Sequence, residues 1–260
     1  MDVYEKMAAL GDEVEEIAIR MAASALAQSR LIHPSPQTTR DRLTAMAFHN
    51  AATSIASSID HLRAVAIVAS GRRIPTFALM TLVRTAHECA LDAQWLLDDV
   101  DEEERVLRGV RVQYEDYTER RKFEQSSNRP PPSKGKLAAD RLADLMRDAA
   151  ALSLLPVAAD GTIHAPKPPP NAVELFDLYE SSQASSGGPV VKGQLFYRLM
   201  SGYAHGKQWA TTIGSVPVGD RDTHGNGAAR IIANDDHTYA LMLQAARRLA
   251  SAADAYLARR

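Results

Sequence analysis

Amphipathic stretches with a helical period alternate with short proline- or glycine-rich breaks along most of the chain, and this alternation restricts the fold to helices. In the first stretch, over residues 2–30, apolar side chains recur at spacings of three and four: Val3, Met7, Leu10, Val14, Ile17 and Met21. This spacing places them on one face of an α-helix. Pro34 and Pro36 then break the helix, because proline cannot donate the backbone hydrogen bond that a helix interior needs.

Local end signals predict where the other helices begin and end. Gly71 suits the end of a helix over 39–70, and Pro75 suits the start of one over 75–99. Asp101 with three following glutamates suits the start of a helix over 101–125. Asn171 and Glu174 have the spacing of a capping box. We also expect helices over 135–152, 189–206 and 234–260.

The expected architecture is an all-α bundle of about seven to eight helices. We expect a single domain, 1–260, made of an N-terminal helix and linker (1–38), a bundle core (39–210), a loop or hairpin (211–233) and a C-terminal helix (234–260). Abundant alanine, leucine and arginine with 6% aromatic residues also favour helices. Within 211–233, TTIGSV and ARIIA could pair as a small β-hairpin.

Composition narrows the classes of function and the compartment. A formal net charge of −2 provides no global attraction to nucleic acid, so RNA binding would need a local basic patch. The lone Cys89 excludes an intramolecular disulfide and fits a reducing cytoplasm. The acidic N-terminus does not resemble a signal peptide, and no apolar run of about 18 residues predicts a membrane span. We therefore expect a cytoplasmic protein without a membrane anchor.

The stretch YRLMSGYAHG contains the candidate chemical site. Arg198 and His205 lie seven residues apart with Ser201 between them, so all three project from one stripe of a helix. On a helical wheel the opposite side of this helix is an apolar arc. It is made of Leu195, Phe196, Leu199, Met200 and Tyr203. Gly202 beside the stripe would let a partner helix approach closely. Two interpretations stay open: a site for a phosphodiester, or a solvated face with His205 near the negative end of the helix dipole.

A second candidate feature lies in the predicted helix over 75–99. Arg84 and Glu88 are four residues apart in a helix that is apolar nearly all round, which predicts a buried ion pair. The pair could support the Arg198–His205 site or could serve only to set the helix register. The neighbouring His87 lacks the second histidine of an H-E-x-x-H zinc motif, so we expect no metal.

Further cations could help to hold phosphates. Arg105 and Arg108 form part of a basic stripe among acidic neighbours, and Lys207 follows the candidate site. A solvated helix face explains the same pattern.

These residues together resemble a known family. Arg198-x6-His205 on a late helix of an all-α chain resembles the R-x4-6-H motif of the HEPN superfamily. The segments TLVRTAHECALDAQWLLDD, ERVLR and YRLMSGYAHG also resemble uncharacterised bacterial helical proteins related to that group. The resemblance covers about residues 40–210.

The resemblance implies a fold, an activity and an assembly. It implies a helical bundle that forms a homodimer in which two motifs face each other, and a metal-independent endoribonuclease of the toxin or defence type without a cofactor. Arg198 would stabilise the negative phosphorane, His205 would transfer protons, and Ser201 and Tyr203 would support them. RNA and an antitoxin or other protein would be the partners. Leu199 replaces a residue that is often polar in active members. The alternative is therefore a non-catalytic module that binds a nucleotide, small ligand or protein.

Overall fold

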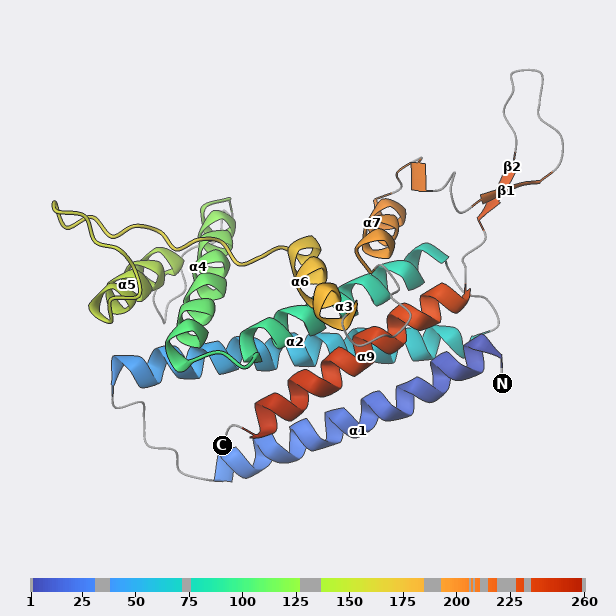
Figure 1. Ribbon diagram of the computed structural model, residues 1–260, viewed down its shortest axis with the longest axis horizontal. Coiled ribbons are helices and arrows are strands. Elements are labelled where there is room, and N and C mark those ends of the chain that lie inside the picture. The colour runs from blue at the N-terminus through green and yellow to red at the C-terminus, as the bar shows by residue number, and fades with distance from the viewer. Residues whose placement is uncertain are drawn as a thin grey trace, which may run out of the picture. The chain divides into compact units, whose positions relative to one another are not determined.

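The computed structural model describes residues 2–30, 38–71, 76–126, 137–184, 193–205, 207, 209–210, 215–218, 228–231 and 235–258. The predicted breaks at Pro34 and Pro36, the start at Pro75 and the stop at Gly206 lie outside these residues. Within them the chain is helical except for one hairpin and one ordered loop, which confirms the all-α fold class (Figure 1).

The helices of the described chain follow the predicted order. They are α1 (Val3–Arg30), α2 (Thr39–Ala69), α3 (Thr76–Leu97), α4 (Glu102–Ser126), α5 (Ala138–Ala151), α6 (Ala172–Ala184), α7 (Gly193–Ala204) and α9 (Asp235–Ala258). The predicted hairpin is formed by β1 (Ser215–Val218) and β2 (Ala228–Ile231), which pair antiparallel with Ser215 opposite Ile231. None of the described helices is long and apolar enough to cross a membrane.

Two predicted helix starts have the expected capping bonds. The Asn171 side-chain oxygen accepts the backbone N–H of Glu174 at 3.2 Å, and the Asn171 N–H donates to the Glu174 carboxylate at 2.7 Å. This reciprocal pair is a capping box. At the start of α4, the Asp101 carboxylate accepts the backbone N–H of Glu104 at 2.7 Å. Local sequence therefore determines where α4 and α6 begin.

Where we expected a single domain over 1–260, the contacts divide the chain into two compact units. Unit 1 contains residues 1–26, 54–94 and 171–260, and unit 2 contains residues 27–53 and 95–170. The helices α1, α2 and α3 each contribute one part to each unit. Both units are built from segments that are distant in sequence.

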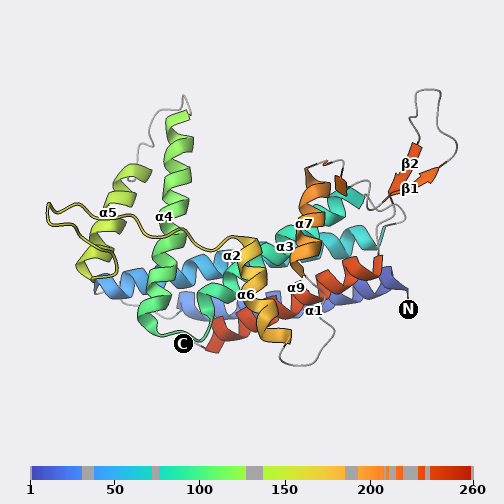
Figure 2. The same ribbon diagram turned by 45° about the horizontal axis from the view of Figure 1, so that its top comes forward.

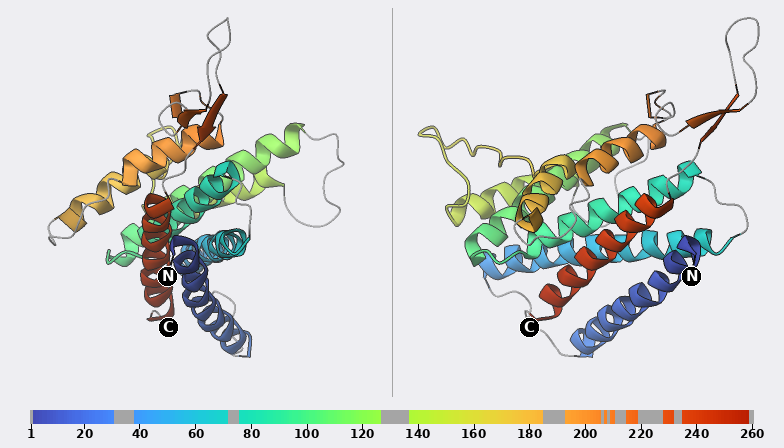
Figure 3. Two further views of the ribbon diagram at one scale, coloured as in Figure 1. Left: turned by 90° about the vertical axis from the view of Figure 1, so that its right-hand side faces the viewer. Right: turned by 45° about the vertical axis from the view of Figure 1, so that its right-hand side comes forward.

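In unit 1, α1 contacts both α2 and α9, and pairs of residues across these contacts give the helix directions (Figures 1 and 3). Arg20 pairs with Asp254 at 2.6 Å, and the Lys6 ammonium lies 5.8 Å from the centre of the Tyr239 ring, so α1 and α9 run parallel. Arg63 of α2 pairs with Glu15 of α1 at 2.6 Å. A Cβ on Gly11 would lie 2.7 Å from the Ala66 Cβ, so α1 and α2 approach closely and run antiparallel.

The helix α3 contacts α2, α7 and α9 in unit 1 (Figure 2). The buried Ser58 hydroxyl of α2 donates to the Ala86 carbonyl at 2.9 Å, and the Cys89 thiol donates to the Ser57 hydroxyl at 3.3 Å. Gln94 near the end of α3 accepts a bond from Arg248 of α9 at 3.2 Å. As predicted, α3 is central in the part of the bundle that carries the candidate site.

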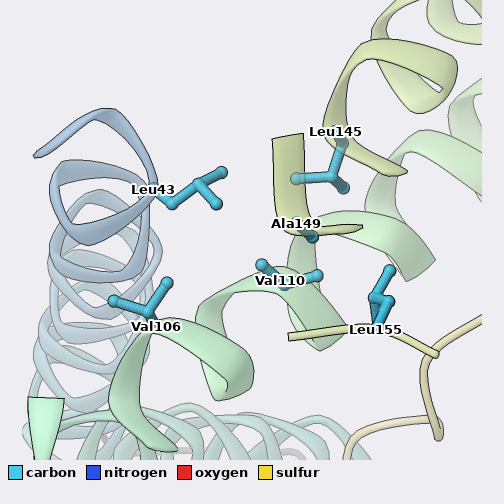
Figure 4. Packing of buried hydrophobic residues seen from close by; sticks show 6 residues of the cluster. All are labelled: Leu43, Val106, Val110, Leu145, Ala149 and Leu155. Carbon is cyan, nitrogen blue, oxygen red and sulfur yellow. The ribbon is translucent and has the colours of Figure 1, made fainter. Parts of the chain in front are cut away.

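Unit 2 has its own apolar core, shown in Figure 4. Its buried residues come from the start of α2, from α4, from α5 and from the loop after α5: Leu43, Val106, Val110, Leu145, Ala149 and Leu155. The segment 155–170 has no helix, but part of it is ordered against this core. Leu155 is buried, and Val157 and Ile163 form an antiparallel bridge.

Gly109 permits a close helix crossing in unit 2. A Cβ built on Gly109 would lie 2.5 Å from the Ala47 Cβ and 2.8 Å from the Ala47 Cα. Because the nearest atoms include backbone, the helices would have to separate to admit even a methyl group. We expect Gly109→Ala to lower the free energy of unfolding by about 1–3 kcal/mol, although alanine is the better helix former. Urea unfolding of the full chain measures this change.

A substitution of Ala47, the residue that faces Gly109, provides the control for this prediction. Ala47→Gly removes one of the two clashing atoms, so Ala47→Gly with Gly109→Ala should recover part of the loss. A Gly109→Ala protein as stable as the wild type would contradict the close approach.

Candidate functional site

Helix α7 carries the candidate motif and is attached to α3 through Tyr197. The Tyr197 hydroxyl donates to the Glu88 carboxylate at 2.5 Å and accepts a bond from the Arg84 guanidinium at 3.1 Å. The same guanidinium donates to Glu88 at 3.0 Å and lies 5.1 Å from the centre of the Tyr197 ring. Arg84, Glu88 and Tyr197 therefore form one three-membered cluster, which we call the Tyr197 cluster.

The Arg84–Glu88 ion pair predicted from the sequence is confirmed, but it is only partly buried. The Arg84 and Glu88 side chains are 19% and 25% exposed to solvent. Burial, together with the hydrogen bond to Glu88, raises the pKa of the Tyr197 phenol. The phenol therefore stays protonated at neutral pH and remains a donor to Glu88.

Sequence reasoning missed Tyr197, although one signal for it was present. Tyr197 precedes the buried Met200 by three residues, so both share the face of α7 that meets the bundle. A partly buried ion pair on α3 needs a further polar partner, and a tyrosine on a facing helix can provide it. Phe176 of α6 also contacts the Tyr197 ring, with the ring centres 5.4 Å apart.

The three predicted stripe residues lie on the solvent side of α7. Arg198 and His205 are exposed and Ser201 is half-buried. Neither the Arg198 nor the His205 side chain forms a hydrogen bond or ion pair with the described part of the chain. The backbone N–H of His205 donates to the Ser201 carbonyl at 3.1 Å, so the helical pattern continues to His205. The stripe geometry expected from the spacing is thus present.

Two residues of the predicted apolar arc behave differently from each other. Tyr203 is buried, with 4% exposure, and packs edge-on against Phe77 at 5.8 Å between ring centres. Its ring is thus part of the core and not of the polar stripe. Leu195 instead is 62% exposed, which corrects its assignment to the core face. Leu195 lies one helical turn before Arg198, so it shares the outer stripe of α7 and not its buried face.

Gly202 permits a close approach, but the approaching group comes from the same chain. A Cβ on Gly202 would lie 2.6 Å from the Ala210 Cβ and 2.8 Å from the Trp209 ring. The segment after α7 therefore folds back over Gly202, where we had expected a partner helix. Trp209 itself stays 49% exposed.

The two arginines predicted to hold phosphates are engaged within unit 2. Arg105 donates to the Val100 carbonyl at 2.7 Å. Arg108 donates to the Trp95 carbonyl at 2.5 Å and to Glu104 at 3.0 Å, and its side chain is 13% exposed. Both guanidinium groups brace the turn between α3 and α4. Lys207, in unit 1, is exposed.

His87 of α3 and Arg248 of α9 are both buried in unit 1. His87 has no exposure, and neither ring nitrogen has a hydrogen-bond partner among the described residues. Its ring packs edge-on against Phe176 at 4.5 Å. Burial, with the charge of Arg248 adding to it, lowers the pKa of His87 to about 3. His87 is therefore a neutral residue of the core at physiological pH.

Within the described ranges, no group of three or more histidine, cysteine, aspartate or glutamate side chains is arranged to hold a metal ion. No protein-family model, curated protein or solved structure matches the chain. The resemblance to the HEPN superfamily therefore stays a hypothesis that rests on the residues of α7 and their helical setting.

Tyr197→Phe removes the hydroxyl that joins α7 to the Arg84–Glu88 pair. We expect this change to lower the free energy of unfolding by about 1–3 kcal/mol, because a charged group loses a hydrogen-bond partner. Tyr203→Phe is the matched control, since no hydrogen bond joins the Tyr203 hydroxyl to the described residues. Chemical unfolding measures both. Equal losses in the two variants would contradict the role of the Tyr197 hydroxyl.

His87 makes stability depend on pH in a defined window. The unfolded chain binds a proton at His87 below about pH 6.5, whereas the folded chain does so only near pH 3, so stability falls as pH drops through this window. At pH 5 the loss is about 2 kcal/mol relative to pH 8.

Unfolding curves at several pH values check this contribution. His87→Leu should remove about 2 kcal/mol of the pH dependence between pH 8 and 5, whereas the exposed His49→Leu should leave it unchanged. The same pH dependence in wild type and His87→Leu would show that other groups cause it.

Proposed function

We propose that the protein is a metal-independent endoribonuclease of the HEPN type that cleaves RNA at the exposed face of α7. The observation that carries this proposal is the common exposure of Arg198 and His205 on one helical stripe, with both side chains unpartnered in the described chain. A guanidinium and an imidazole that form no hydrogen bond or ion pair with the described residues are available for a ligand.

The attachment of α7 supports the proposal. Tyr197 bonds to Glu88 and Arg84, and Tyr203 packs on Phe77, so two residues six positions apart hold the inner face of α7 on α3. The rotation of α7 is thereby set, and the outer stripe points in a defined direction. Catalytic groups act efficiently when a rigid element positions them. Arg84 and Glu88 would therefore support the site through Tyr197.

The proposed RNA cleavage uses only Arg198, His205 and the 2′-hydroxyl of the RNA itself. The ribose 2′-oxygen attacks the adjacent phosphorus, a new P–O2′ bond forms, and the P–O5′ bond breaks. His205 would accept the 2′-hydroxyl proton or donate one to the leaving 5′-oxygen. Arg198 would stabilise the extra negative charge on the phosphorane oxygens. The products are a 2′,3′-cyclic phosphate and a 5′-hydroxyl end.

A homodimer would complete such a site. One imidazole per chain can serve as base or as acid, whereas two copies of the motif provide both at once. The exposed Leu195 lies one turn before Arg198 on the same stripe and offers an apolar contact for a second copy. The enzyme would act in the cytoplasm as a toxin or defence effector, with an antitoxin or other protein as regulator.

A second candidate is a non-catalytic module that binds a protein partner. Leu195 and Trp209 are 62% and 49% exposed, and large exposed apolar side chains of this kind are typical of protein interfaces. Such a module would use Arg198 for recognition and would leave RNA intact.

The decisive experiment is a cleavage assay on the purified full chain in excess EDTA with a mixed-sequence RNA. We expect cleavage that Arg198→Ala and His205→Ala each reduce at least about 100-fold, because each removes a group used in the transition state. The corresponding 2′-O-methyl RNA should stay intact, since it lacks the attacking hydroxyl.

Substitutions of the same residue types elsewhere serve as controls. Arg147→Ala and His49→Ala change exposed residues outside α7 and should leave the rate unchanged. Circular dichroism verifies that each variant is folded. If the wild type leaves varied RNAs intact, the ribonuclease proposal is wrong and the binding module is favoured.

A further inference from the structure

Unit 2 contains a cleft of about 590 Å³ that the proposed ribonuclease does not use. Its walls are the first turns of α2, the middle of α4 and one stripe of α5. This volume lies in the range of sites for small molecules. The cleft is formed entirely within one compact unit, on the side of the apolar core shown in Figure 4.

The floor of the cleft is apolar. Leu43 and Leu145 belong to the unit 2 core and are 2% and 4% exposed, and Met46 packs against that core. Tyr117 of α4 adds an aromatic ring to the lining. A ligand with an apolar or aromatic side group would thus have apolar side chains to pack against.

The charged groups of the cleft are balanced in sign. Arg42 of α2 donates to Asp148 of α5 at 2.7 Å, so this pair ties the two helices together across the cleft. Arg141 and Asp144 also line the cleft and lie one turn apart on α5. Asp144 in addition contacts the exposed Arg147 at 3.1 Å, so the carboxylate lies at the border between cleft and solvent.

We propose that this cleft binds a small zwitterion with an apolar side group, of the kind represented by apolar amino acids. The ligand carboxylate would pair with Arg141, its ammonium with Asp144, and its side group would cover Leu145 and Met46. A guanidinium and a carboxylate one helical turn apart match a ligand whose ammonium and carboxylate groups are attached to the same carbon atom.

Ligands with charge of one sign fit less well. An anion would meet Asp144 and Asp148 as well as the arginines, and a cation would meet Arg42 and Arg141. Either would place a ligand charge beside a partly exposed side chain of like charge, which is unfavourable. The mixed lining therefore selects for a zwitterion.

The test titrates the full chain, labelled with [¹³C]methyl-methionine, with L-phenylalanine at millimolar concentration and follows the Met46 signal, which Met46→Leu identifies. We expect the Met46 signal to shift on saturation. N-acetylphenylalanine and phenylalaninamide each lack one charge, and glycine lacks the apolar group. All three should bind at least about tenfold more weakly.

Substitutions on α5 locate the ligand. Arg141→Gln and Asp144→Asn should each weaken phenylalanine binding about tenfold or more, because each removes a charged partner. Asp140→Asn makes the same chemical change at an exposed residue outside the cleft and should have no effect.

Three results would overturn the proposal: no shift of Met46 with phenylalanine, equal binding of the N-acetylated or amidated ligand, or binding that Arg141→Gln and Asp144→Asn leave unchanged. RNA cleavage plays no part in this measurement, so its outcome is independent of the ribonuclease assay.

Discussion

The orientation of α7 depends on one carboxylate. Glu88 accepts bonds from both Arg84 and Tyr197, and these bonds connect α7 to a helix more than a hundred residues earlier in the chain. A tyrosine hydroxyl between two charged groups is strongly directional, so it sets the rotation of α7 as well as its position. The exposure of Arg198 and His205 follows from this contact, because the opposite face of the helix is turned inward. The cluster thus relates an internal interaction of unit 1 to the chemistry available on its surface.

Close helix contacts and buried polar groups have opposite effects on the stability of this bundle. Gly109 in unit 2 and Gly11 in unit 1 allow helix backbones to approach so closely that a Cβ would clash. Close packing of this kind adds dispersion contacts. Buried His87 and Arg248 reduce stability, since burial disfavours their charged forms and leaves some of their nitrogens without partners. Unit 1 is therefore expected to lose stability in acid.

The arginines of the chain show how the same residue type serves different purposes. Arg108 packs over Trp95 and bonds to its carbonyl in the last turn of α3, so its charge is used to join α4 to the end of α3. Arg42 ties α2 to α5 beside a cleft of balanced charge. Arg198 has no such internal role in the described chain. A net charge of −2 hides this difference, because function depends on which charges are left for ligands and not on their sum.

The sequence by itself determined the helices and several of their ends. Apolar spacing and capping residues such as Asn171 and Asp101 act over a few neighbouring positions, so they can be read without knowledge of the fold. The Arg84–Glu88 pair and the Arg198–His205 stripe were predictable for the same reason. Only the tertiary structure decided that Tyr197 joins the ion pair, that Leu195 is exposed and that Arg105 and Arg108 brace a turn. It also decided the division into two units and the cleft on α5. These features depend on segments far apart in the chain, and the helical period states which residues share a face but not what that face meets.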